Sequence, residues 1–185
     1  MQALLNLDHS VFFFLNNIAG RSYVVDSSIV YLAEYLAYFL VIVLLLLLFA
    51  SKKSVREKMM IAVAAFLSAA IARGFLTEVI RHFVLRPRPF VAHQVHQLIA
   101  ETSYSFPSGH AMFFFAFSTA IYMYNKTWGA WFFVASTIVC LARVAAGVHY
   151  PSDILGGAVL GAATGWLVMR FGMPLAEKIL PRTHA

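Results

Sequence analysis

The sequence predicts an all-α protein, an integral membrane helical bundle with about five transmembrane helices and an amino-terminal interfacial helix. The first observation behind this prediction is composition: of 185 residues, 61% are hydrophobic and only 12% are charged, against about 25% charged residues in soluble domains. The second is the length of the apolar runs, because a hydrocarbon core of about 30 Å requires roughly 20 apolar residues in a helix. We expect one membrane-embedded domain over residues 1–185.

The amino-terminal segment, residues 1–22, is too polar and too short to span a bilayer. Its apolar residues are interrupted by Asn6, Asp8 and His9, which is typical of an amphipathic helix lying in the interface. It also lacks the basic start and the small-residue cleavage pattern of a secretory signal. We therefore expect an interfacial helix ahead of a transmembrane core over residues 26–172.

Five apolar runs in that core have the character of membrane spans. The first, Ile29–Ala50, contains Glu34 as its only formal charge. The others, separated by polar or proline-containing breaks, are Met59–Ile80, Ser108–Tyr124, Thr127–Gly147 and Asp153–Phe171. The last run carries small residues that are expected to allow close helix packing. They are Gly156, Gly157, Gly161 and Gly165.

Positive charge is concentrated on one side of the predicted topology. The net charge is +6, and most basic residues follow the first, third and fifth runs. They are Lys52, Lys53, Arg56, Lys58, Lys126, Arg170, Lys178 and Arg182. The positive-inside rule makes that side cytoplasmic, with a tail over residues 173–185, so membrane phospholipids and not nucleic acid are the expected anionic partner. The single Cys140 excludes a disulfide or a thiolate metal cluster within the chain.

Three polar segments fall together on the outer side of the membrane. They are Arg81–Pro89, Pro107–His110 and Arg143–Asp153. Because the spans alternate in direction and the lysine-rich loop is inside, all three emerge at the extracytoplasmic face of a multi-pass cell-membrane protein. Their arginines and histidines are suited to breaking a phosphate ester or anhydride at a membrane surface.

The first segment holds arginines around two prolines that end the second span. Arg81 and Arg88 are candidate phosphate ligands, because planar guanidinium groups bind phosphate oxygens in pairs. Arg86 is left open between phosphate contact and snorkelling to lipid headgroups.

The second segment has the form of a helix start. Pro107 precedes Ser108, a possible cap, and Gly109, whose missing Cβ lets a ligand approach the backbone. Free N–H groups and the helix dipole make this an anion site with His110 beside it.

The third segment adds Arg143, His149 and Asp153. Asp153 falls in the first turn of the last span, where the dipole favours its ionised form. We expect its carboxylate to accept a hydrogen bond from one ring nitrogen of His149, which leaves the other nitrogen neutral, nucleophilic and facing a phosphate.

Taken in order, these elements resemble the three-part signature of the type 2 phosphatidic acid phosphatase superfamily. The chain departs from it at Arg81, where the family usually has Lys, and at Ala142, where it usually has Ser. The resemblance implies that His149 attacks phosphorus to form a phosphohistidine, Asp153 orients it and His110 protonates the leaving oxygen. It assigns the phosphoryl oxygens to Arg81, Arg88, Ser108, Gly109 and Arg143, with no metal and no cofactor.

The stretch Arg88-Pro89-Phe90-Val91-Ala92-His93 with Val95-His96 is similar to the bacitracin-resistance branch, the undecaprenyl pyrophosphate phosphatases of bacterial envelopes. This resemblance implies a lipid pyrophosphate substrate, whose terminal phosphate is removed at the outer leaflet to return the monophosphate carrier to peptidoglycan synthesis.

Three other interpretations remain open at this point. The same chemistry could act on phosphatidylglycerol phosphate or phosphatidic acid, since acyl and prenyl tails contact similar apolar surfaces. A metal site could use the outer histidines, namely His93, His96, His110 and His149. Ionisable groups within the spans could serve a small transporter, although we expect Arg73 and Glu34 to form a structural pair. Oligomeric state, tail length and a gating role for the amino-terminal helix are left open.

Overall fold

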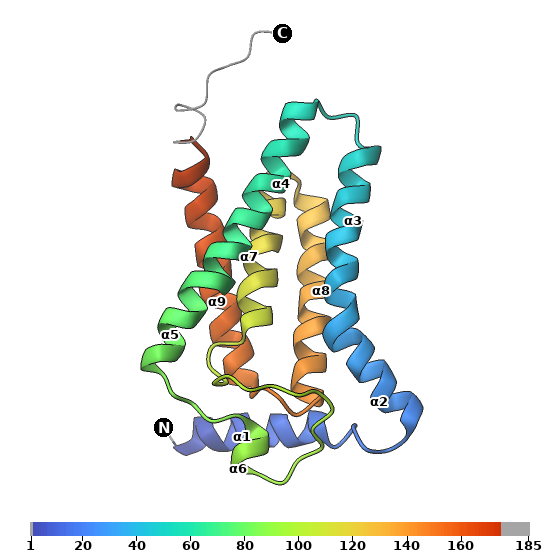
Figure 1. Cartoon of the computed structure of the whole chain (residues 1–185), viewed down its shortest axis with the longest axis vertical. Coiled ribbons are helices and arrows are strands. Elements are labelled where there is room, and N and C mark those ends of the chain that lie inside the picture. The colour runs from blue at the N-terminus through green and yellow to red at the C-terminus, as the bar shows by residue number, and fades with distance from the viewer. Residues whose placement is uncertain (1, 175–185) are drawn as a thin grey trace.

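The computed structural model describes residues 2–174, and every regular element within them is helical (Figure 1). Helix α1, Gln2–Asn16, lies across one end of an elongated bundle (Figure 1). Ser22 then starts the first long helix by accepting a hydrogen bond from the Val25 amide at 3.3 Å. Because of this cap the helix begins at Tyr23, ahead of the apolar run that starts at Ile29.

The bundle is built from long helices, three of which contain a π-helical turn. The first joins α2 (Tyr23–Val30), a π turn (Tyr31–Tyr35) and α3 (Leu36–Ala50). The second joins α4 (Val55–Ala70), a π turn (Ile71–Leu76) and α5 (Thr77–Phe83). A loop containing the short α6 (Pro89–Ala92) leads to α7 (Gly109–Tyr124), α8 (Lys126–Ala145) and α9 (Pro151–Leu167), which ends in a π turn (Val168–Gly172).

Four of these helices are long and apolar enough to cross a membrane. They are Tyr23–Ala50, Val55–Phe83, Lys126–Ala145 and Pro151–Gly172, with 28, 29, 20 and 22 residues. Helix α7 has 16 residues and is a shorter fifth helix beside these four within residues 2–174. The predicted all-α membrane bundle is confirmed.

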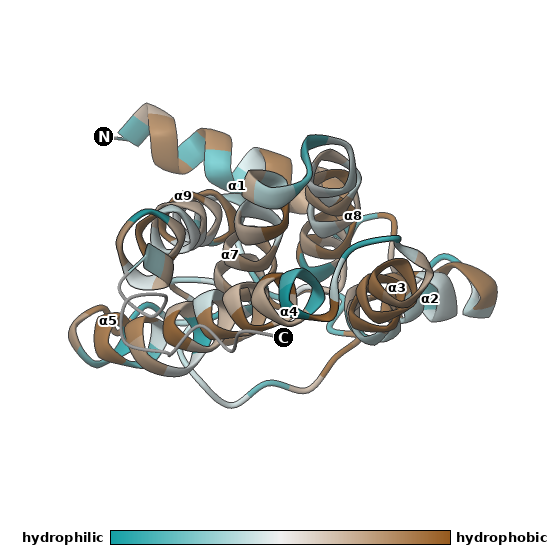
Figure 2. Cartoon of the chain, turned by 90° about the horizontal axis from the view of Figure 1, so that it is seen from above, coloured by the Kyte–Doolittle hydropathy of each residue, from teal (hydrophilic) through white to brown (hydrophobic). Residues whose placement is uncertain are grey.

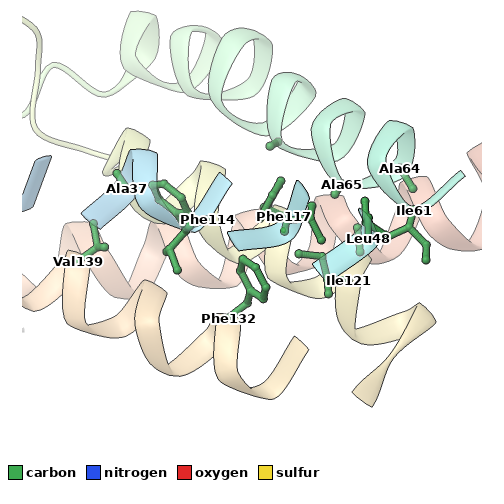
Figure 3. Close-up of a cluster of buried hydrophobic side chains, with 14 of the residues drawn as sticks. Ala37, Leu48, Ile61, Ala64, Ala65, Phe114, Phe117, Ile121, Phe132 and Val139 are labelled. Atoms are coloured by element: carbon green, nitrogen blue, oxygen red, sulfur yellow. The ribbon is translucent and has the colours of Figure 1, made fainter. Parts of the chain in front are cut away.

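The short α7 is the centre of the bundle, where it packs against α9, α8 and α4. Its residues Phe114, Phe117 and Ile121 are buried in a cluster with Ala65 of α4 and Phe132 of α8 (Figure 3). A helix surrounded by protein on several sides does not have to match the thickness of the lipid along its own length. Packing of this kind, rather than escape from water, holds helices together inside a membrane.

Small residues of α9 allow it to approach α7 closely. A Cβ atom added at Gly161 would lie 2.5 Å from the Met112 carbonyl oxygen, and one at Gly165 would lie 2.6 Å from that of Ala116. Since backbone atoms cannot move aside locally, only glycine fits at these two positions. The predicted role of this small-residue face in helix packing is therefore confirmed.

The outside of the bundle is apolar, as a lipid-facing surface must be (Figure 2). Phe49 and Phe75 are among its most exposed side chains, with 86% and 64% of their surface uncovered. The lysine-bearing turn between α3 and α4 lies at the end of the bundle opposite α1 (Figure 1). Lys178 and Arg182 of the expected cytoplasmic tail lie outside the described residues.

Candidate active site

The three polar segments meet at the end of the bundle that α1 crosses (Figure 1). Arg81 lies in the last turn of α5, Pro107 precedes the start of α7, and His149 lies in the turn between α8 and α9. Arg81 Nη2 donates to the Pro107 carbonyl at 3.2 Å, which joins the first segment to the second. The Ser108 amide donates to the Asp153 carbonyl at 3.1 Å, which joins the second to the third.

The start of α7 has the expected form. Ser108 is buried and caps the helix, its hydroxyl accepting from the Ala111 amide at 3.4 Å. A Cβ atom at Gly109 would lie 2.4 Å from Arg73 Nε, so the missing side chain lets Arg73 pass directly over the helix terminus. Arg73 itself pairs with Glu78 at 2.8 Å. The expected pair of Arg73 with Glu34 is therefore wrong, because Arg73 pairs instead with Glu78, five residues further along the chain.

Arg81 and Arg88 are both buried, with 5% and 2% of their surface exposed. Ser103 bridges them, accepting from Arg81 Nη1 and Arg88 Nη2 at 3.1 Å each through its hydroxyl. Arg88 also donates to the Val148 carbonyl at 2.7 Å and lies 3.3 Å from Nε2 of His149. Burial lowers the pKa of Arg88 to about 10, which still leaves it charged at neutral pH.

Glu101 lies between Arg88 and Arg143. Its Oε2 accepts from Arg88 Nη2 at 3.2 Å, and its Oε1 accepts from Arg143 Nη2. Burial alone would raise the pKa of Glu101, but Arg143 and Arg88 outweigh it, so the pKa is lowered and the carboxylate is ionised. An anionic side chain thus sits within an arginine cluster formed by Arg81, Arg88 and Arg143.

The arginine cluster has unused hydrogen-bonding capacity. In the part of the chain that the structure describes, four buried side-chain polar atoms lack a hydrogen-bond partner, and three of them belong to this site. They are Arg81 Nε, Arg143 Nε and His149 Nδ1. Buried polar groups are nearly always paired, and unpaired ones mark places where a ligand or water belongs.

His149 and Asp153 lie next to each other but do not form the expected hydrogen bond. His149 Nδ1 is 3.5 Å from Asp153 Oδ2, which instead accepts from the Tyr150 amide at 2.8 Å. Asp153 Oδ1 accepts from Arg86 at 2.7 Å. That expectation is corrected to a neighbouring pair, because the two atoms are too far apart for a hydrogen bond. Burial, then Arg88 and Arg143, hold the pKa of His149 well below its usual range, so its ring is neutral.

His110 is half-buried beside a cavity of about 470 Å³ that Arg143, Glu101 and Gly109 also line. A second cavity of about 770 Å³ is lined by Arg81, Arg88 and Glu101. Glu101 is common to both cavities, so its side chain separates two spaces that each reach an arginine of the cluster.

His93 and His96, two of the four histidines considered as metal ligands, make other contacts in the structure. His93 packs edge-on against His9, with ring centroids 5.1 Å apart, and the His96 amide bonds Asn16 at 3.1 Å. Among residues 2–174, no three His, Cys, Asp or Glu side chains are grouped as ligands of one ion.

Sequence reasoning missed two of the residues that complete this site. Glu101 belongs to none of the three polar segments, although it is the one acidic residue between Glu78 and Asp153. Asp8 of α1 was treated as a polar interruption, yet it pairs with Arg86 at 2.8 Å. The sequence does not decide between a phosphate contact and a lipid headgroup contact for Arg86. In the structure its side chain pairs instead with two carboxylates of the protein, Asp8 and Asp153.

Comparison with known proteins adds named relatives to this geometry. Bacitracin transport permease protein BcrC of Bacillus licheniformis is 33% identical over 89% of this chain and 79% of its own length. Undecaprenyl-diphosphatase BcrC of Bacillus subtilis is 30% identical over 89% of this chain and 84% of its own. Phosphatidylglycerophosphatase B of the same bacterium is 33% identical over 52% of this chain and 51% of its own.

Two solved structures have a similar fold. The crystal structure of Aquifex aeolicus LpxE has a TM-score of 0.71 and 26% identity, covering 89% of this chain and 96% of that one. A transmembrane PAP2-type phosphatidylglycerolphosphate phosphatase from Bacillus subtilis has a TM-score of 0.67 and 20% identity, covering 100% of this chain and 90% of that one, and supports the fold alone. Residues 62–175, more than half of the sequence, match the PAP2 superfamily. By this match and by its relatives, the chain belongs to the PAP2 superfamily.

Proposed function

We propose that this protein is an undecaprenyl pyrophosphate phosphatase, which removes the terminal phosphate of the lipid pyrophosphate at the extracytoplasmic face of the membrane. The relative named undecaprenyl-diphosphatase, matched over most of both chains, supports the substrate class. The arginine cluster at the end of the bundle that α1 crosses supports phosphate chemistry at that end. The lysine-bearing turn at the opposite end supports an orientation in which that turn is cytoplasmic (Figure 1).

The observation that carries this proposal is uncompensated positive charge in a buried place. Arg81, Arg88 and Arg143 come from separate elements, and each has 5% or less of its surface exposed. Arg88 and Arg143 share the carboxylate of Glu101, while Arg81 pairs with Glu78 at 3.5 Å, and Glu78 is itself exposed. Buried charges require partners, so this cluster is suited to a second anion with several oxygen atoms. A terminal phosphate meets that requirement, with the carboxylate of Glu101 giving way to it.

In the first chemical step, the neutral ring of His149 is the nucleophile. Nε2, the nitrogen facing Arg88, forms a bond to the terminal phosphorus while the bond from phosphorus to the bridging oxygen breaks. His110 donates a proton to that oxygen, and undecaprenyl phosphate leaves. Arg81, Arg88 and Arg143 stabilise the charge that spreads over the equatorial oxygens.

In the second step, water cleaves the phosphohistidine. His110, now neutral, accepts a proton from the water as its oxygen bonds phosphorus and the phosphorus–nitrogen bond breaks. Inorganic phosphate and neutral His149 are released. The amide of Gly109, at a helix position without an intrahelical acceptor, is placed to bind a phosphoryl oxygen in both steps, as is the hydroxyl of Ser108.

Phosphate release by the purified protein tests this proposal. We expect wild type to hydrolyse undecaprenyl pyrophosphate in the presence of a chelator, and His149→Asn to lose activity by at least about 1000-fold, as expected for loss of a nucleophile. Faster turnover of phosphatidylglycerol phosphate or phosphatidic acid would replace the substrate but keep the mechanism. Activity that chelation abolishes and zinc restores would contradict metal-free chemistry.

The orientation is tested by cysteine labelling in intact cells. In a Cys140→Ala background, a membrane-impermeant maleimide should label Gln94→Cys, which is exposed in the loop after α6, but not Lys52→Cys in the α3–α4 turn. The reverse pattern would contradict an extracytoplasmic site. Bacitracin uptake that survives His149→Asn would favour transport over hydrolysis.

A further inference from the structure

Arg86 joins three carboxylate or hydroxyl groups from two other parts of the chain. Its Nη1 donates to Asp153 Oδ1 and to the Ser152 hydroxyl, each at 2.7 Å. Its Nη2 donates to Asp8 Oδ2 at 2.8 Å. Asp153 is fully buried, whereas the Arg86 side chain keeps 23% of its surface exposed at the edge of the site. Arg86 is therefore the residue through which α1 reaches Asp153.

Asp8 fixes both Arg86 and the start of α9. Its Oδ1 accepts from the Ser152 amide at 2.8 Å, and its Oδ2 accepts from the Ser152 hydroxyl at 2.5 Å as well as from Arg86. Burial alone would raise the pKa of Asp8, but the hydrogen bonds from Ser152 and Arg86 outweigh it and the pKa is lowered. The guanidinium of Arg86 also stacks over the Tyr150 ring, 4.2 Å from its centroid.

This arrangement determines which way the carboxylate of Asp153 faces. With Oδ1 held by Arg86, Oδ2 is the oxygen directed toward Nδ1 of His149. If Arg86 were absent, the carboxylate would keep the hydrogen bond from the Tyr150 amide but lose the contact that holds its other oxygen. It could then rotate about its terminal torsion, which is soft in an aspartate.

Helix α1 is also held at its last residue, Asn16. Asn16 donates to the carbonyls of His96 and Ala145 at 2.8 and 2.9 Å and accepts from the His96 amide at 3.1 Å. The helix is thus attached to the loop before α7, to the end of α8 and to the start of α9. Attachment at the middle and at the last residue of α1 suits a fixed support for the site rather than a lid that opens for substrate.

We propose that Arg86, held in place by Asp8 of α1, is a positioning residue that orients Asp153 toward His149. This inference rests on the proposed function, because it assigns Asp153 and His149 to the phosphoryl transfer. The side chain of Arg86 makes no hydrogen bond or ion pair with His149 or with the arginine cluster, all within the described residues, so its effect passes through Asp153. The amino-terminal helix is therefore a part of the active site, and Asp8 is its contribution.

The expected signature is a loss of kcat with little change in KM. Arg86→Gln should lower kcat for undecaprenyl pyrophosphate by about 10 to 100-fold, the usual effect of removing a residue that orients a catalytic ligand. KM should stay within about threefold, because the phosphate-binding arginines are untouched. Arg86→Lys keeps a charge and one donor and should recover most of the rate. Asp8→Asn should lower kcat by less than Arg86→Gln.

The double variant shows whether Asp8 acts through Arg86. If it does, Asp8→Asn combined with Arg86→Gln should be no slower than Arg86→Gln alone. Matched controls are Asp26→Asn and Arg21→Gln, which make the same charge changes near α1. The native Asp26 side chain accepts a hydrogen bond from the Gly20 amide, and the native Arg21 side chain donates one to the Asn17 carbonyl, so neither reaches the site. Both should retain wild-type kcat.

Three outcomes would overturn the inference. A kcat for Arg86→Gln within twofold of wild type would show that Asp153 does not need it. A rise in KM with kcat unchanged would make Arg86 a substrate ligand. Failure of Arg86→Lys to recover any rate, with helicity lost, would reduce the role to folding. A wild type that hydrolyses no lipid phosphate would overturn the proposed function instead, and this inference with it.

Discussion

The carboxylate of Glu101 occupies the space between Arg88 and Arg143 that we assign to phosphate, and its removal gives a quantitative test. In Glu101→Gln one negative charge disappears, but the side-chain oxygen remains as a neutral acceptor. Phosphate then no longer has to displace an ion from the arginines. We expect inorganic phosphate to become a stronger competitive inhibitor and the KM for lipid pyrophosphate to fall.

The magnitude follows from the two ion pairs that Glu101 makes. Its side chain is 25% exposed, so each pair lies between the buried and the solvent-screened limits, and we assign about 1 kcal/mol to each. Loss of both ion pairs would tighten phosphate binding by about 2 kcal/mol, or about 30-fold in affinity. If the amide oxygen of Gln keeps one of the two interactions, the gain in phosphate affinity is about fivefold. The inhibition constant of phosphate should therefore fall by about 5 to 30-fold.

The assay is inhibition of undecaprenyl pyrophosphate hydrolysis by phosphate at constant ionic strength. Glu57→Gln is the matched control, since it makes the same charge change in the capping box of α4, and Gln can replace Glu in that box. Its inhibition constant should equal that of wild type. A weaker inhibition by phosphate in Glu101→Gln would mean that Glu101 holds the arginines in place for the substrate, and our reasoning would be refuted.

Further predictions concern protonation, packing and the family's variable position. At pH 6 an ordinary histidine of pKa about 6.5 is mostly protonated, whereas burial keeps the pKa of His149 well below that range. Nitrogen NMR at pH 6 should therefore show a neutral His149 ring. A charged ring would contradict this prediction. Gly161→Ala, which places a Cβ 2.5 Å from the Met112 carbonyl oxygen, should destabilise the protein by about 1–3 kcal/mol in thermal unfolding. Gly74→Ala is the control and should not destabilise it, because a Cβ at Gly74 would meet no atom within 4 Å. Equal effects of the two variants would contradict the role of Gly161 in packing. Arg81→Lys keeps the charge that stabilises the equatorial oxygens but loses one of the two bonds that Arg81 donates. KM should therefore rise by about 5 to 10-fold with kcat nearly constant, and a hundredfold loss of kcat would show that the positive charge alone does not fulfil the role of Arg81.

The location of the site could be predicted from the sequence because two simple signals determine it. The apolar runs set the number and direction of the helices, and these in turn place Arg81, Ser108 and His149 at one end of the bundle. Helix starts were also predictable where a capping residue marks them, as at Ser108. The exception is the first span, which begins at Tyr23 because Ser22 caps a stretch that is not uniformly apolar.

The contacts inside the site could not be predicted, because they depend on irregular backbone. Glu101 lies in the loop before α7, where neither a helical nor a strand period relates a side chain to its neighbours. Arg86 could face lipid or protein equally well until the position of α1 was known, since Asp8 is far from it in sequence. The spacing of His149 and Asp153 predicted that they are neighbours, but it carried no information on the amide and arginine that already bond the aspartate.

The proposed mechanism depends on a phosphohistidine at His149, and trapping this intermediate tests the mechanism. Enzyme mixed with undecaprenyl pyrophosphate labelled in its terminal phosphate, then quenched in alkali within the first turnover, should carry acid-labile, base-stable label on the peptide that contains His149. The label should be absent from His149→Asn. Label on any other residue, or hydrolysis by His149→Asn at the wild-type rate, would contradict the mechanism.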